Sequence, residues 1–298
     1  MPINLVFQEK PGVLATHWKV FSKRGSRLKK GEALPEMTAE WKSARMKSEH
    51  LAAYTAICGF PENGYLPPTY PFVMAVTMHF SLLGHPAFPL APTGGVHARN
   101  RILQRRPINA NEVFDLWCAV GPSRVVKQGL EFDMLTRADI GGAAMWECVS
   151  TYLVRGSRFG EPGPAPADAK FEELDGANIE TGWNVPYGMG RRYAKITGDF
   201  NPIHLHKYTA KLFGFPTDIV HGMWSLGKCA AQLHVPDPAA PLRLDAAFKG
   251  PVFMGSNVTL KAQSSETGHR FDLFCGDNPR PVINGAYRNT TAEDRLLP

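Results

Sequence analysis

The chain has 298 residues, of which 44% are hydrophobic and 20% are charged, and this balance excludes a disordered, collagen-like or coiled-coil protein as a whole. At about 150 residues per domain, the length predicts two domains. The formal net charge of +6 lies entirely in residues 1–155, which hold 18 Lys/Arg and 12 Asp/Glu, whereas residues 156–298 hold 15 of each. This bias fits an anionic partner without identifying it.

The basic residues of the first half form two groups. The first group is Lys19, Lys23, Arg24, Arg27, Lys29 and Lys30, and the second is Arg99, Arg101, Arg105 and Arg106. Neither group has interleaved aromatic residues or a nucleic-acid motif, so we interpret the first as a solvated surface loop and expect no nucleic-acid partner.

The chain order of predicted elements is the same in both halves. Short helices are predicted at 49–58 and 189–197, and longer apolar helices at 70–83 and 222–233. Strands follow at 97–106, 112–120, 125–137 and 144–154, and again at 242–249, 256–263, 269–275 and 281–288. Helices followed by consecutive strands predict an α+β fold, in which an antiparallel sheet wraps around a central helix.

Between the halves, residues 156–166 contain three Gly and three Pro, which is typical of a linker. We therefore predict an N-terminal repeat at 1–155, a linker at 156–170 and a C-terminal repeat at 171–298.

Three local matches indicate a duplication. The segment from Tyr54 to Gly59 resembles that from Tyr193 to Gly198 at an offset of 139 positions. The Phe-Asp pair at 132–133 returns at 271–272 with the same offset, and a proline at 107 returns at 251.

The cysteine pattern and the hydropathy of the chain indicate where in the cell the protein is located. The five cysteines include no Cys-x-x-Cys pair, which argues against a disulfide framework or a thiolate zinc site and favours a reducing, cytoplasmic location. The most apolar run, at 70–83, is too short to cross a bilayer, and Glu9 and Lys10 interrupt the segment where a signal peptide would be apolar. We expect neither membrane attachment nor a leader.

The residues that carry chemistry follow the predicted helix at 189–197. Asp199, Asn201 and His204 crowd together there, and Pro202 prevents regular helix. A carboxylate and an imidazole across such a turn could hold one water between them, and an imidazole with a pKa near 6.5 can act as a base near neutral pH.

The longer helix of the second half begins at His221-Gly222-Met223. Gly222 lacks a Cβ and would present its N–H, with the positive end of the helix behind it, to a carbonyl oxygen that gains negative charge. The segment therefore offers the groups needed to add water to a double bond conjugated with a thioester.

The segment from Tyr193 to Met223 resembles the hydratase 2 motif of the MaoC-like family, which includes (R)-specific enoyl-CoA hydratases and acyl dehydratases. The resemblance is in the order and spacing of Tyr193, Gly-Asp-x-Asn-Pro-x-His, Gly-Phe and His-Gly-Met. The resemblance implies a double hot-dog fold and reversible syn hydration of trans-2-enoyl-CoA to (R)-3-hydroxyacyl-CoA. It implies Asp199 and His204 as the catalytic pair, Gly222 as oxyanion donor, and Asn201 and His221 as positioning residues, without metal or cofactor. His206 and Asp218 depart from the family pattern and put substrate detail in doubt.

The first half lacks the catalytic pair, because Phe60 stands where its counterpart has Asp199 and no Asn-Pro-x-His follows. We expect one active site per chain and a substrate-holding role for the first half. Arg105 and Arg106 are the candidates for contacts with the phosphates of coenzyme A.

Several alternatives remain open from the sequence. His204, His206, His221 and Asp199 form a permissible metal ligand set. A hot-dog thioesterase and a non-catalytic acyl-CoA binding protein are the alternative functions. The carrier is coenzyme A or acyl carrier protein, and a homodimer is favoured although a fused pair of hot dogs also allows a monomer.

Overall fold

A computed structural model describes residues 2–13, 16–17, 20, 27–91, 95–164, 166, 171 and 174–297. In chain order its strands are β1 (Ile3–Phe7), β2 (Met37–Ala44), β3 (Gly95–Gln104), β4 (Phe114–Val126), β5 (Gly129–Ile140), β6 (Ala143–Arg155), β7 (Ile179–Asn184), β8 (Leu242–Phe248), β9 (Asn257–Ser264), β10 (Gly268–Cys275) and β11 (Ile283–Asn289). Its helices are α2 (Ser48–Cys58), α3 (Tyr70–Leu83), α4 (Met189–Thr197), the 3-10 helix η2 (Pro202–His204), α5 (Lys207–Leu212) and α6 (Gly222–Gln232).

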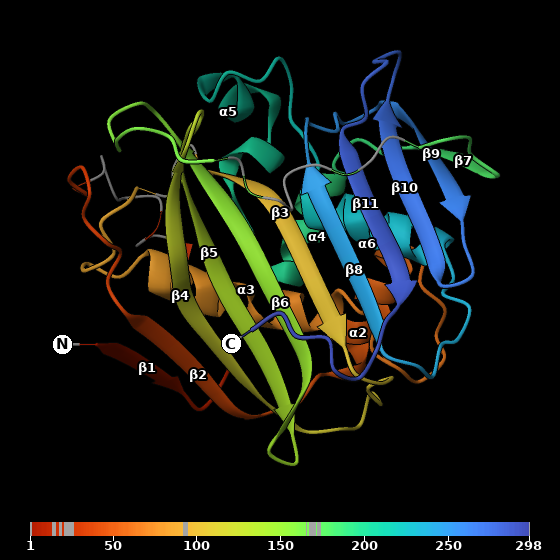
Figure 1. The fold of residues 1–298 in the computed structure, drawn as a ribbon, viewed down its shortest axis with the longest axis horizontal. Helices are drawn as coiled ribbons and strands as arrows, with labels where there is room; N and C mark the ends of the chain where they lie inside the picture. Colours follow the sequence, from red (N-terminus) through yellow and green to blue (C-terminus); the bar gives the residue numbers. More distant parts are fainter. Residues whose placement is uncertain are drawn as a thin grey trace.

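The strands form one continuous sheet in the order β1-β2-β4-β5-β6-β3-β8-β11-β10-β9-β7 (Figure 1). From the central β3–β8 pair outward, the order β3, β6, β5, β4, β2 is repeated on the other side as β8, β11, β10, β9, β7. Adjacent strands are antiparallel except for β1, which adds to β2 in parallel. The expected α+β double hot-dog fold is therefore confirmed, with both repeats in one sheet.

The helices α2, α3, α4 and α6 lie on one face of this sheet (Figure 1). Helix α3 is apolar all round and is almost completely buried, as expected for a helix wrapped by a sheet. On α6, the Trp224 indole is 2% exposed and donates its Nε1–H to the carbonyl oxygen of Ile57 on α2, at 3.0 Å. The two halves therefore share one core.

The duplication is visible in the helix ends. Helices α2 and α4 both end at a glycine in the left-handed conformation, Gly59 with φ 83° and Gly198 with φ 84°, at the predicted offset. The boundary placed at 156–170 stays a prediction, and residues 165 and 167–170 lie outside the described part of the chain.

The predicted helices agree with the structure better than the predicted strands do. The four helices are confirmed to within a residue or two, but the strand predicted at 125–137 is wrong, because a turn at Lys127 and Gln128 divides it between β4 and β5. The first strand of each repeat, β2 and β7, was not predicted, and neither were β1, η2 and α5. Of the first basic group, Arg27, Lys29 and Lys30 are exposed, whereas positions 19, 23 and 24 lie outside the described residues.

Two further observations concern cysteines and hydropathy. All five cysteines are buried and free. Among the helices that the structure describes, none combines the length and the apolar character that a bilayer span requires.

Candidate active site

A cavity of about 270 Å³ lies between the two halves and is lined by both. From the second half it receives polar side chains, including Asp199, Asn201, His204, His221 and Ser225, together with Gly222. From the first half it receives mainly apolar and aromatic side chains, including Phe72, Val76, Phe80, Phe88, Leu90 and Phe132. All five site residues of the second half that the sequence predicts therefore meet in one cavity.

The end of α4 determines where Asp199 points. Gly198 leaves the helix with φ 84°, and a Cβ at this position would lie 3.0 Å from a methyl of Val13 and 3.2 Å from one of Thr77. Both the backbone conformation and the close packing therefore require glycine. The Asp199 carboxylate then accepts a hydrogen bond from the backbone N–H of Asn201, at 3.2 Å, which fixes the turn.

Asn201 precedes the 3-10 helix η2 and caps it. Its side-chain oxygen accepts a hydrogen bond from the backbone N–H of Ile203, at 3.4 Å, while the residue also lines the cavity. With Pro202 as the first residue of η2, this cap fixes the path of the chain into His204.

His204 is buried, and its Nδ1–H donates to the carbonyl oxygen of Ile219 at 2.8 Å. Because a carbonyl only accepts, Nδ1 carries the proton and Nε2 keeps its lone pair. Burial, together with the neighbouring His221, lowers the pKa of His204 to about 3, although the charge of Asp199 acts in the opposite direction. The imidazole is therefore neutral at physiological pH and able to accept a proton.

The carboxylate of Asp199 and the ring nitrogens of His204 and His221 approach within 4.8 Å of one another. Two hydrogen bonds of about 2.8 Å that meet at a tetrahedral oxygen span about 4.6 Å. The Asp199 carboxylate and the His204 ring are therefore close enough for one water molecule to bridge them.

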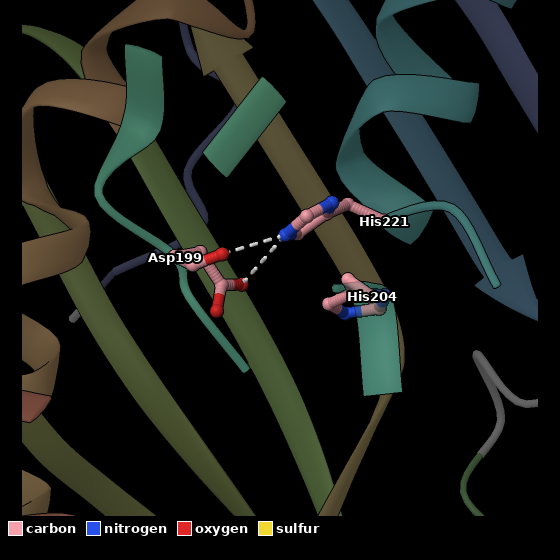
Figure 2. A group of neighbouring side chains, drawn as sticks. All are labelled: Asp199, His204 and His221. Atoms are coloured by element: carbon pink, nitrogen blue, oxygen red, sulfur yellow. Dashed lines mark hydrogen bonds and ion pairs between the residues drawn. The ribbon is translucent and has the colours of Figure 1, made fainter. Parts of the chain in front are cut away.

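Figure 2 shows the His221 ring beside that of His204, with one of its nitrogens joined to Asp199. The His221 ring stacks on that of His204 with centroids 3.7 Å apart, and its Nε2–H donates to the backbone carbonyl of Asp199 at 2.8 Å. The same nitrogen lies 3.8 Å from the Asp199 carboxylate. Burial lowers the pKa of His221 to about 4, so this ring is also neutral. It holds the backbone that carries Asp199 as well as lining the cavity.

Gly222 is the first residue of α6 and lines the cavity. Its N–H belongs to the first turn, where backbone donors have no partner within the helix, and the helix dipole adds partial positive charge. A Cβ at Gly222 would lie 3.0 Å from the ring of Phe248 on β8. Only glycine lets the aromatic ring pack against this helix end without displacement.

A metal bound through Nε2 of His221 would compete with an existing interaction. The Nε2–H of His221 donates to a carbonyl oxygen, and it could bind a metal only after losing that hydrogen bond. His206, which the sequence includes in a ligand set, lies elsewhere: it is exposed and its Nδ1 accepts from the backbone of Tyr208. The four-residue ligand set is thus not brought together.

The structure does not bring Arg105 and Arg106 to the cavity. They follow the end of β3 that is opposite to the cavity-lining residue His97, about 26 Å along an extended strand. Arg105 pairs with Glu147 at 3.0 Å, and Arg106 pairs with Glu112 at 2.7 Å. Carboxylates therefore already neutralise both guanidinium groups.

The cations that do line the cavity are Arg155, at the end of β6, and Lys249, directly after β8. Neither residue was predicted from the sequence. No motif surrounds them, and only the folded sheet brings their strand ends to the same edge.

Two polar residues of the first half also escaped prediction. His97 on β3 and Tyr152 on β6 line the cavity among apolar neighbours. Their adjacent positions on paired strands depend on the register of the sheet, which a single sequence does not state.

Comparisons with known proteins agree with this architecture. The family described as "MaoC like domain" matches residues 183–285. The chain is 31% identical over 239 residues to the 3-hydroxyacyl-thioester dehydratase X of Mycobacterium tuberculosis, covering 80% of this chain and 84% of that protein. It is 38% identical over 77 residues to a 3-hydroxybutyryl-CoA dehydratase of Methylorubrum extorquens, covering 25% of this chain and 49% of that one.

Solved structures give the same picture. A crystal structure of HtdX of Mycobacterium tuberculosis superimposes with a TM-score of 0.72 at 28% identity, covering 85% of this chain and all 100% of that chain. A MaoC-like dehydratase of Phytophthora capsici shares the fold with a TM-score of 0.65 at 18% identity, covering 92% and 98% of the two chains.

Proposed function

This chain belongs to the MaoC-like dehydratase family, and we propose that it adds water reversibly to trans-2-enoyl thioesters at the Asp199–His204 pair, giving (R)-3-hydroxyacyl thioesters. It is an acyl-thioester hydratase or dehydratase, an enzyme of the hydro-lyase class. The observation that carries the assignment of the site is a carboxylate and a neutral imidazole within 4.8 Å of each other, beside a helix end that can receive an oxyanion.

In the direction of hydration, the water held by both residues is the nucleophile. The lone pair on Nε2 of His204 accepts a proton from this water while its oxygen bonds to Cβ, and the Asp199 carboxylate accepts the other water proton as a hydrogen bond. The electron pair of the double bond moves to the thioester oxygen, which the N–H of Gly222 stabilises.

The second half of the reaction returns the proton. The imidazolium of His204 is stabilised by the charge of Asp199, which acts to raise the pKa of this histidine. It then delivers the proton to Cα on the face from which water was added. The electron pair returns from the thioester oxygen to form the new C–H bond, and His204 is neutral again. Dehydration is the same sequence reversed.

The apolar part of the cavity accounts for the acyl chain. Phe72, Val76 and Phe80 on α3, with Phe132 on β5, form walls that can bury methylene groups and nothing charged. We therefore assign the substrate-holding role to the first half. Coenzyme A is the carrier we propose, with its phosphates near Arg155 and Lys249, and the five free cysteines support a reducing, cytoplasmic location.

The test is the loss of enoyl-thioester absorbance with purified wild type, Asp199→Asn and His204→Ala, using CoA and acyl-carrier-protein thioesters. Because a positioned acid or base contributes about 10²- to 10⁴-fold, we expect each variant to lose at least 100-fold in kcat/KM. His206→Asn is the matched control from the same segment, since His206 is exposed and can keep its capping role as Asn.

Unchanged turnover in both catalytic variants would contradict the assignment of the site. Release of free thiol without hydration, measured in the same reactions with a thiol reagent, would instead indicate thioester hydrolysis.

A further inference from the structure

Strand β3 contains an irregularity that turns one side chain into the cavity. His97 pairs with Tyr152 and Arg99 pairs with Thr151, so that Ala98 is an extra residue in the pairing with β6. In a regular strand residues 97 and 99 would share a face. Here His97 lines the cavity, whereas Arg99 pairs with Glu131 away from it. Bulges of this kind redirect side chains and occur often beside active sites.

His97 and Tyr152 form a stacked pair in the cavity wall. Their ring centroids are 4.8 Å apart with 22° between the planes. The ring centroid of His97 lies 5.9 Å from that of Phe72 and 4.9 Å from that of Phe248. Since Phe248 also packs against Gly222, the pair lies near the thioester end of the proposed substrate.

The hydroxyl of Tyr152 is available to a ligand. Among the residues that the structure describes, it has no hydrogen-bond partner, yet the side chain lines the cavity. Burial raises the pKa of Tyr152, and the charge of Asp199 acts in the same direction, so the phenol stays protonated and can donate. A donor without a partner in a largely apolar wall is costly unless a ligand or water satisfies it.

His97 makes the pair neutral as well as polar. Burial, and then the neighbouring His79, lower the pKa of His97 to about 3. Its Nε2 lies 3.5 Å from the side-chain nitrogen of Asn100. The same Asn100 nitrogen donates a hydrogen bond to the hydroxyl of Ser150, at 2.9 Å. The ring of His97 also has a hydrogen bond with the backbone of Arg99, which acts to raise its pKa. The neutral group left to bind an uncharged oxygen is therefore the Tyr152 hydroxyl, with the neutral His97 ring stacked beside it.

We propose that the Tyr152 hydroxyl, with its ring stacked on His97, forms a subsite for a hydroxyl or oxo group on the acyl chain, close to the carbons that react. This inference rests on the proposed function and deepens it, because it names the substrate class: enoyl thioesters that carry an additional neutral oxygen. A purely apolar acyl chain leaves the Tyr152 donor unsatisfied at the same place.

The test compares trans-2-hexenoyl-CoA with its 4-hydroxy and 5-hydroxy derivatives. One neutral hydrogen bond of about 1 to 1.5 kcal/mol corresponds to about a fivefold to tenfold preference. We expect wild type to prefer at least one hydroxylated substrate by this factor in kcat/KM. Tyr152→Phe should abolish the preference, so that its kcat/KM for the hydroxylated substrates falls by more than its kcat/KM for the unsubstituted one. Tyr287→Phe, at a buried tyrosine of β11 that does not line the cavity, should keep it.

Wild type without preference for either derivative would overturn the subsite, and so would an equal loss for all three substrates in Tyr152→Phe. Calorimetric binding of hexanoyl-CoA and its 5-hydroxy and 4-hydroxy derivatives tests the subsite without turnover. A binding preference that Tyr152→Phe removes supports the subsite even if no enoyl thioester is hydrated, in which case only the proposed function fails.

Discussion

This protein should lose much of its stability already in mild acid, at pH values well above those at which its carboxylates become protonated. Desolvation is the first cause of a strongly lowered pKa at four histidines: about 4 for His79 and His221, and about 3 for His97 and His204. The pKa of His50 is lowered as well, again first by burial. The unfolded chain takes up protons near pH 6.5 at each of the four, whereas the folded chain does not. Their contribution to stability is therefore complete above pH 6.5 and decreases as the pH falls.

The expected size follows from the linkage relation. Between pH 7.5 and 5.5 each histidine lowers the free energy of unfolding by about 1.4 kcal/mol, and the four together by about 5 kcal/mol. A domain-sized protein has a total stability of about 5 to 15 kcal/mol, so this loss is large. Urea denaturation at several pH values in this range measures the loss. The slope of the free energy of unfolding against pH should correspond to nearly four protons taken up per molecule unfolded.

His79→Gln provides the matched control. His79 lies on α3 outside the catalytic residues, and its Nε2 contacts the hydroxyl of Thr136 at 2.7 Å, which glutamine can still reach with its amide. The proton uptake should fall from four to three in this variant. A loss of stability below about 2 kcal/mol between pH 7.5 and 5.5 in wild type would refute the reasoning.

Two other predictions test the substrate end of the cavity. Gly222→Ala should push away the ring of Phe248 and move the oxyanion donor, so we expect kcat to fall at least tenfold with little change in KM; equal activity would contradict the role of this N–H. Arg155→Gln should raise the KM for acyl-CoA several-fold at unchanged kcat, whereas Arg105→Gln should change thermal stability and leave KM unaltered, because Arg105 already pairs with Glu147. The reverse result would return the phosphate-binding role to Arg105.

The sequence was most informative where chemistry is local. Asp199, Asn201 and His204 lie within six positions, and the glycine and proline beside them determine a turn whatever the rest of the chain does. The long helix at 70–83 was equally clear, because its uninterrupted apolar character suits only a buried element. These features could be recognised without knowing the sheet.

The first half of the site depended on pairing between distant strands. Neither His97 nor Tyr152 belongs to a motif, and only the bulge at Ala98 turns His97 toward Tyr152, 55 positions later in the chain. Counting charges could not show that the fold gives Arg105 and Arg106 the partners Glu147 and Glu112. Register and ion pairing are tertiary properties, and local propensity does not determine them.

The central β3–β8 pair has a consequence for how the active site assembles. Asn100 lies opposite Ala246 in this pair, so the seam between the repeats is a ladder of backbone hydrogen bonds within one polypeptide. The two halves that line the cavity are therefore parts of one chain, and forming the cavity is a unimolecular event. Specific activity should stay constant on dilution, since no encounter between separate subunits is needed to bring the two halves together.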